Sequence, residues 1–189
     1  MGHLLWSGIV PEERAGLVAA TLMDDGLWSG WGVRTLSSRE AAYNPLVYHN
    51  GTVWPHDNSL AACGLARAGH PRDAEHILGR MIEAAMHFDY RLPEVFAGFR
   101  RTTERPPVVY PTASSPQAWA AGTPVLLLQV LLGLEPVRVE RVLRSRREGL
   151  PAWAEGLVLS GIHAFGHLWV ARVQDGAVTV TSAASVGSR

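Results

Sequence analysis

The chain of 189 residues has a single cysteine, no lysine and no long apolar run. With Cys63 alone, an internal disulfide and a cysteine-based zinc site are both excluded. The longest apolar stretch, PVLLLQVLLGL, is too short to cross a bilayer. The first ten residues lack both a basic segment before the apolar one and a small-residue cleavage site, so they do not resemble a secretory signal. We therefore expect a cytoplasmic protein.

Charge and motif content exclude several classes of function. The 17 basic and 17 acidic residues balance, so nothing favours nucleic acid or a membrane surface as a partner. The sequence contains no P-loop, GxGxxG or GxSxG motif, which leaves nucleotide, dinucleotide and serine-nucleophile chemistry without support. His49 and His56 are seven positions apart with Asp57 next to His56, but the sequence shows no His-x-x-x-His pair on a helix and no further ligand. We expect neither a metal nor another cofactor.

Seven tryptophans are many for this length. Core packing is the default explanation for any one of them. The alternative is sugar stacking, in which the apolar face of a pyranose lies on an indole while polar side chains meet its hydroxyls. The stretch YHNGTVWPHDN, residues 48–58, surrounds Trp54 with His, Asn and Asp residues. This setting favours sugar binding.

The first two thirds of the chain predict helices joined by long polar loops. Asn58 stands at a capping position, and Pro71 suits the first turn of a helix. The last of these helices is apolar nearly all round and should lie inside, kinked or divided at Pro124. Helices are expected over residues 11–23, 59–69, 70–88 and 115–134. Inner helices that follow long polar loops are typical of a ring of helical hairpins around a shared cavity.

The C-terminal part predicts a small β appendage. Residues 156–161, 168–173 and 177–183 alternate with period two and are rich in Val, and QDGA between the last two suits a hairpin turn. The charged segment EPVRVERVLRSRREGLP fits either a short helix or a strand. We expect a helical domain over 1–135, a β appendage over 136–182 and a disordered tail over 183–189.

Two carboxylates are candidates for chemistry. Glu94 follows Pro93 among apolar residues, so it could be a partly desolvated base, although a solvated loop residue is the simpler explanation. Asp57 could pair with a helix N-terminus or bind a sugar. Glycoside hydrolysis normally needs two carboxylates on opposite sides of the scissile bond. Local sequence does not decide between these alternatives.

Five ordered motifs add a family resemblance: GHLLWSGIV, SGWGVRTLS, AYNPLVYHNGTVWPHDN, RLPEVFAGF and YPTASSPQAWAAG. From Gly2 to about Val180 the chain resembles the C-terminal portion of bacterial amylo-α-1,6-glucosidase and glycogen debranching enzyme-like proteins, which are six-hairpin glycosidases. The resemblance implies a mostly α fold, about the C-terminal half of an (α/α)6 toroid. It also implies an inverting mechanism on α-linked glucosides.

The resemblance assigns roles to residues. Glu94 matches the presumed general base of the LPE motif, with Gln117 and Trp119 in the segment that follows that motif. The residues expected to bind the sugar are His49, Asn50, Trp54, Asp57, Trp31, Arg34, Tyr43, Gln117 and Trp119.

One part of the family pattern has no match in this sequence. The general acid, an aspartate, lies upstream of the GHLLWSGIV motif in the family. We therefore expect a fragment that is nearly inactive alone, and whose partners are an α-glucan or oligosaccharide and the N-terminal remainder of the catalytic domain. Two alternatives stay open. One is a non-catalytic module that binds a carbohydrate or a partner domain; the other is the same fold acting on another glycoside, such as a glucosyl- or mannosylglycerate.

Overall fold

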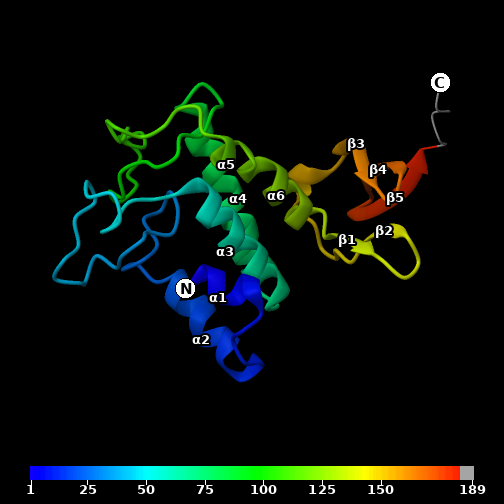
Figure 1. The fold of residues 1–189 in the computed structure, drawn as a ribbon, viewed down its shortest axis with the longest axis horizontal. Coiled ribbons are helices and arrows are strands. Elements are labelled where there is room, and N and C mark those ends of the chain that lie inside the picture. Colours follow the sequence, from blue (N-terminus) through cyan, green and yellow to red (C-terminus); the bar gives the residue numbers. More distant parts are fainter. Residues whose placement is uncertain (184–189) are drawn as a thin grey trace. The chain divides into compact units, whose positions relative to one another are not determined.

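The computed structural model describes residues 1–183 and divides into two compact units, Met1–Leu127 and a second that begins at Leu128 (Figure 1). The chain thus combines helices with two small sheets. The boundary falls within α6, before the expected boundary at residue 135. Ala183 ends the last strand, and the rest of the expected tail, 184–189, lies outside the described residues. The helices are α1 (Gly2–Ser7), α2 (Glu12–Leu22), α3 (Pro55–Arg67), α4 (Pro71–Met86), α5 (Ala118–Ala121) and α6 (Thr123–Leu131).

Helix α3 is the centre of the first unit and packs against both α1 and α4. Small residues allow the close approach to α1. A Cβ at Gly64 would lie 2.6 Å from the backbone nitrogen of Trp6, and one at Gly2 would lie 2.6 Å from the Cβ of Ala61. Such distances are too short for any side chain, so glycine is required at both positions. Helical spacing in the sequence predicts one buried apolar stripe in α4, formed by Ala74, Ile77, Leu78, Met81, Ile82, Ala85 and Met86. The first four are buried, together with Ala84, whereas Ile82 and Met86 are exposed.

The start of α3 differs from the prediction. Pro55 occupies the first helical position behind an extended Trp54, so the helix begins earlier than expected. Asn58, predicted as the cap, lies inside the helix and is buried. Its side chain accepts a hydrogen bond from the Val33 amide at 2.7 Å and donates to the carbonyls of Val33 and Trp54 at 3.1 and 2.9 Å. Asn58 therefore ties the long loop to the helix.

The polar loops before α3 and α5 are ordered by isolated β-bridges. Val53 pairs with Arg34 on one side and with Phe96 on the other, and Phe96 also pairs with Val109. Val53 and Phe96 are completely buried. At Gly98 the two loops touch, because a Cβ there would lie 1.6 Å from the carbonyl oxygen of Gly51. These pairings hold residues 48–58 beside residue 94.

The predicted helix over 115–134 is divided. Gly122 separates α5 from α6, and Pro124 stands in the first turn of α6, where proline is tolerated. The expectation that this helix lies wholly inside is wrong for the described residues. Leu127 and Leu131 are buried, whereas Val125 is exposed.

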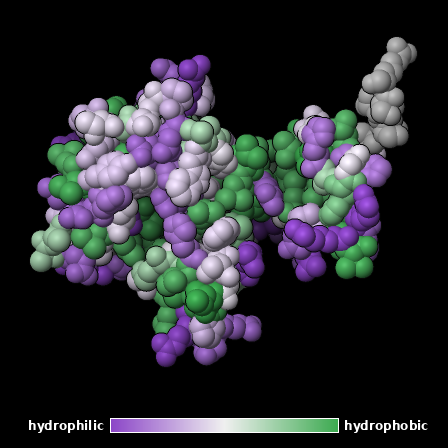
Figure 2. Space-filling model, in the orientation of Figure 1, coloured by the Kyte–Doolittle hydropathy of each residue, from purple (hydrophilic) through white to green (hydrophobic). Residues whose placement is uncertain are grey.

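Other apolar side chains of the first unit also face solvent. Leu4, Ile9 and Leu17, in or beside α1 and α2, are exposed. Figure 2 shows apolar residues over this part of the first unit. Within residues 1–183, every helix falls short of the length and apolar character that a bilayer-spanning helix needs.

The second unit consists of antiparallel strands. They are β1 (Leu134–Val137), β2 (Val142–Ser145), β3 (Val158–Ala164), β4 (His167–Gln174) and β5 (Ala177–Ala183), in sheets β1-β2 and β3-β4-β5. Trp169, Ala171 and Val173 of β4 anchor its core. The three predicted strands and the predicted hairpin are confirmed, with Asp175 and Gly176 at φ 53° and 71° in the turn. The segment left open between helix and strand forms β1 and β2.

Candidate active site

A groove of about 1020 Å³ opens in the first unit. Its wall combines α1, the loop after α2, the N-terminal turn of α3 and the start of α5. This volume suits a small ligand of one or a few rings. Among the predicted residues, those that line it are Arg34, His49, Trp54, Asp57 and Trp119.

The Trp54 indole is held at both its edge and its face. Its Nε1 donates to Thr52 Oγ1 at 3.0 Å and to the Tyr48 carbonyl at 3.2 Å. The His49 imidazole stacks on it, with ring centroids 5.4 Å apart and planes 12° apart, and the Tyr48 ring meets it edge-on at 4.7 Å. A fixed indole at the groove wall is the geometry that stacking against a sugar requires.

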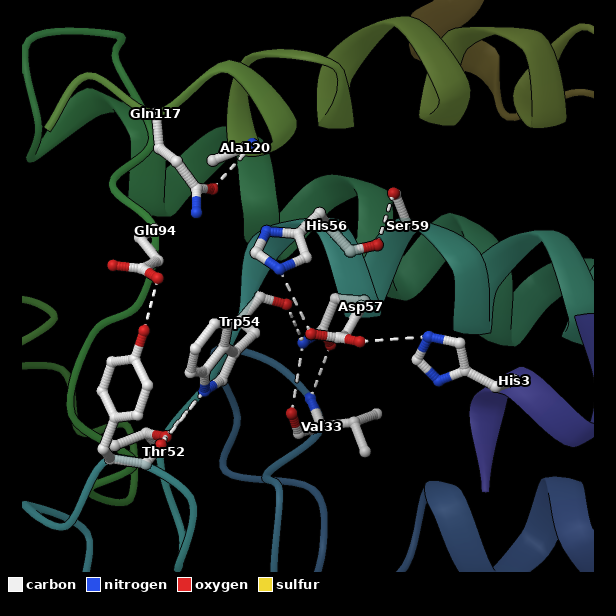
Figure 3. Close-up of polar contacts among 12 residues, drawn as sticks. His3, Val33, Thr52, Trp54, His56, Asp57, Ser59, Glu94, Gln117 and Ala120 are labelled. Atoms are coloured by element: carbon white, nitrogen blue, oxygen red, sulfur yellow. Dashed lines mark hydrogen bonds and ion pairs between the residues drawn. The ribbon is translucent and has the colours of Figure 1, made fainter. Parts of the chain in front are cut away.

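Glu94 lies beside this aromatic cluster, joined to it through Tyr48 (Figure 3). The Tyr48 hydroxyl donates a hydrogen bond to Oε1, and the Ser114 amide donates to Oε2 at 3.1 Å. In return, the Glu94 amide donates to the Ser114 carbonyl at 2.9 Å. Backbone pairing fixes the residue, and the two side-chain bonds fix the carboxylate.

These contacts set the charge of the pair. The Tyr48 hydroxyl and then the Ser114 amide lower the pKa of Glu94, and the nearby His56 and His49 lower it further. In the opposite sense, the carboxylate raises the pKa of Tyr48 to about 12. Glu94 is therefore ionised at neutral pH, as a general base must be, while Tyr48 remains a protonated donor.

A His–Asp–His arrangement forms another part of the groove wall. Asp57 lies 3.1 Å from Nε2 of His3 through one oxygen and 3.4 Å from Nε2 of His56 through the other. His56 is almost completely buried, and this burial lowers its pKa. Asp57 and Glu94 oppose that shift, whereas His3 adds to it. Because α3 begins at Pro55, Asp57 stands in the first helical turn and not before the helix, and it lines the groove.

The start of α5 completes the site. Gln117 caps this short helix, because its Oε1 accepts a hydrogen bond from the Ala120 amide at 3.2 Å. Figure 3 shows the amide nitrogen of Gln117 turned toward the space bordered by Glu94, Trp54 and His56. Trp119 stacks on His56 with one face, yet 59% of its surface is exposed.

Comparison with known families gives this geometry a context. The model of the family described as "Mannosylglycerate hydrolase MGH1-like glycoside hydrolase domain" matches residues 3–100, more than half of the chain. The chain belongs to this glycoside hydrolase family. The match covers Tyr48, Trp54 and Glu94 and ends before Gln117 and Trp119. No curated protein matches the chain.

Three residues of the glycoside hydrolase domain that were expected at the sugar are engaged elsewhere. Arg34 is buried and donates to the carbonyls of Gly98, Gly26 and Asp25 at 2.6, 3.1 and 3.3 Å, so it braces the groove wall. The Tyr43 hydroxyl donates to the same Gly98 carbonyl at 3.2 Å. Asn50 closes a loop through its backbone: its amide donates to the Val47 carbonyl, and its carbonyl accepts from the Asn44 amide.

Trp31 is not brought to the groove. It is buried, with the guanidinium of Arg101 5.0 Å above its ring and His87 edge-on at 5.9 Å. It borders a separate cavity of about 90 Å³. Core packing, the default explanation for a tryptophan, describes Trp31.

Sequence reasoning missed the partners of the predicted residues. Tyr48 opened the singled-out stretch, but no local pattern indicated that its hydroxyl would reach Glu94. The sequence offers His56 as part of the sugar-binding stretch or as a metal ligand, but it does not indicate the pairing of His56 and His3 with Asp57. Within residues 1–183, His, Cys, Asp and Glu side chains form no group of three or more that could hold a metal ion.

Proposed function

We propose that this glycoside hydrolase domain acts by inversion on an α-linked hexoside, with Glu94 as the general base. One observation carries the proposal: the carboxylate of Glu94 is held ionised by the Tyr48 hydroxyl, and the Tyr48 ring contacts His49 and Trp54, which line the groove. The base takes a proton from water as the water oxygen attacks the anomeric carbon. At the same time, a general acid protonates the leaving oxygen from the opposite face.

The groove supports stacking and hydrogen bonding of the sugar. Trp54 and Trp119 offer aromatic surface, while His49, Asp57 and the amide of Gln117 provide polar groups around the ring. Arg34 and Tyr43 act indirectly in this proposal, by bracing the loop that carries His49.

The general acid is proposed to come from the N-terminal remainder of the catalytic domain, which completes an (α/α)6 toroid. The acid must be protonated before reaction, which requires a raised pKa. Asp24 lines the groove, but hydrogen bonds from the Gly26 amide and Arg39 lower its pKa. Asp57 is held between His3 and His56. Glu40 also lines the groove but is exposed to solvent. None of the three suits the acid, so we expect residues 1–189 alone to be nearly inactive.

Two substrate classes follow from the two lines of support. The family description names mannosylglycerate hydrolase, which favours a hexosyl glycerate. The resemblance of the five motifs favours an α-glucoside of the glycogen-debranching type. A groove of about 1020 Å³ fits either a disaccharide-sized molecule or the end of a glucan chain.

The test is hydrolysis of mannosylglycerate, glucosylglycerate and an α-1,6-branched glucan. Each substrate is offered to the 189-residue chain and to a protein extended upstream of Met1, and the anomer first released is identified by NMR. We expect turnover in the extended protein with inversion at the anomeric carbon. Retention, or no hydrolysis of any of the three, would refute the proposal; rapid hydrolysis by the chain alone would refute the missing acid.

A non-catalytic carbohydrate-binding module is the second candidate, favoured by the engagement of Asp24 and Asp57 in ion pairs. Calorimetry separates the two. A binding module gives the same glycan affinity with and without an upstream segment, and it releases no product.

A further inference from the structure

Tyr48 touches both halves of the candidate site. Its hydroxyl donates to Glu94, and its ring meets the Trp54 indole edge-on at 4.7 Å and the His49 imidazole at 4.6 Å. Its carbonyl accepts hydrogen bonds from Thr52 Oγ1 at 2.6 Å and from Trp54 Nε1 at 3.2 Å. One residue thus contacts the base, the stacking indole and the loop between them.

We propose that Tyr48 is a positioning residue of the hydrolysis: its hydroxyl orients the Glu94 carboxylate, and its ring and carbonyl set the Trp54 indole at a fixed place relative to that carboxylate. This inference rests on the proposed function, because it assigns the role through Glu94. It goes beyond that function by naming the group that couples the base to the surface on which the sugar lies.

Geometry explains why such a coupling matters. In an inverting reaction, a water molecule must fit between the base and the anomeric carbon. The distance between the carboxylate and the bound sugar therefore has to stay fixed. Glu94 lies in the loop before α5, whereas Trp54 immediately precedes α3, and the two are 40 positions apart in sequence. The bridge Val53–Phe96 brings the two segments together. Tyr48 then fixes the side chains themselves.

The pair is also electrostatically matched. A carboxylate that accepts a hydrogen bond from a phenol keeps its negative charge at lower pH. The hydrogen bond between the two side chains lowers the pKa of Glu94 and raises the pKa of Tyr48. The two pKa values can be measured separately in the 189-residue chain, and each measurement tests the hydrogen bond.

The first measurement is a spectrophotometric titration of the tyrosines in the full 189-residue chain and in Glu94→Gln. We expect one tyrosine of the wild type to ionise near pH 12. In Glu94→Gln this tyrosine should ionise nearer its ordinary pKa of about 10, because the negative neighbour has been removed. Identical titrations of the two proteins would overturn the contact and, with it, the proposal.

The second measurement follows binding of the cationic iminosugars 1-deoxynojirimycin and 1-deoxymannojirimycin as a function of pH. Their ammonium group pairs with an ionised Glu94, so affinity should fall as the carboxylate is protonated. In Tyr48→Phe, which keeps the ring, this fall should begin at higher pH, leaving binding about tenfold weaker than in the wild type on the acid side. Tyr90→Phe is the matched control, because Tyr90 is exposed.

The outcomes distinguish the proposed function of Glu94 from the positioning role of Tyr48. If the wild type and Glu94→Gln bind both iminosugars equally, or the wild type binds neither, Glu94 does not face a sugar and the proposed function fails. If Glu94→Gln loses binding while Tyr48→Phe follows the wild-type pH profile, the proposed function stands and the positioning role of Tyr48 is refuted. Tyr48→Leu, which also removes the ring, should weaken binding at every pH.

Discussion

The imidazole of His56 lies nearly parallel to the indole of Trp119, with 4.2 Å between the ring centroids and 19° between the planes. His56 is buried and belongs to α3, whereas Trp119 is largely exposed and belongs to α5. The contact therefore covers one face of the indole and leaves the rest of its surface exposed to the groove. A sugar ring can stack on this exposed surface without disturbing the packing of His56.

Replacing Trp119 should accordingly weaken sugar binding and spare the fold. For Trp119→Ala we expect about fivefold lower iminosugar affinity, which corresponds to roughly 1 kcal/mol of lost stacking. The free energy of unfolding should change little. Trp153→Ala is a matched control, because Trp153 is 58% exposed and lies in the second unit. Calorimetry that gave the two variants equal affinities would exclude Trp119 from the site.

Asn58 should be important for stability. Its side chain makes three hydrogen bonds to backbone groups of Val33 and Trp54 from a buried position. Asn58→Ala removes the side-chain partner of the Val33 amide and carbonyl, while the Trp54 carbonyl keeps the backbone amide of residue 58, so we expect a loss of about 2–3 kcal/mol in the free energy of unfolding. Asn44→Ala removes one exposed hydrogen bond and should cost less than about 1 kcal/mol. Urea denaturation measures both; a similar loss in the two variants would contradict the role assigned to Asn58.

Burial of His56 predicts a pH dependence of stability. The folded state holds this imidazole neutral, with its pKa below the ordinary value of about 6.5. As pH falls below about 6.5, the unfolded chain binds a proton that the folded chain does not, so stability decreases until the folded pKa is passed. Asp57 and Glu94 moderate this loss, and His3 increases it.

The variant His56→Gln tests this dependence, because glutamine does not titrate. Between pH 8 and pH 5 its free energy of unfolding should fall less than that of the wild type. The carboxylates with lowered pKa lose their contribution mainly below about pH 5, where the unfolded chain begins to protonate them, so the loss between pH 8 and pH 5 reports the imidazole. His163→Gln, at an exposed position of β3, serves as the control. Parallel stability profiles for wild type and His56→Gln would contradict the assignment.

Local patterns were sufficient for the elements whose neighbours agree with them. The period-two strands of the second unit form as predicted, since alternation and a suitable turn determine a hairpin within a few residues. The buried side of α4 was predictable in part from helical spacing, but Ile82 and Met86, which the spacing assigns to that side, are exposed.

Tertiary contacts determine the start of α3 and the arrangement of the site residues. Asn58 resembles a capping residue, but Pro55 starts the helix earlier, and the side-chain oxygen of Asn58 accepts a hydrogen bond from the Val33 amide. Among the site residues, the motif resemblance placed Glu94 and Trp54 in one cluster. It could not show that Tyr48 joins them or that Trp31 packs under Arg101, because both depend on pairing between distant loops.

The measurement that tests the central claim most directly is the turnover of Glu94→Gln in the extended, active protein, on whichever of the three substrates the wild type hydrolyses. The amide keeps the shape of the carboxylate but cannot take a proton from water. We predict a loss of about 10²–10⁴-fold in turnover with substrate affinity retained, while Glu104→Gln, at an exposed position of the following loop, behaves as the wild type. Wild-type turnover by Glu94→Gln would contradict the account.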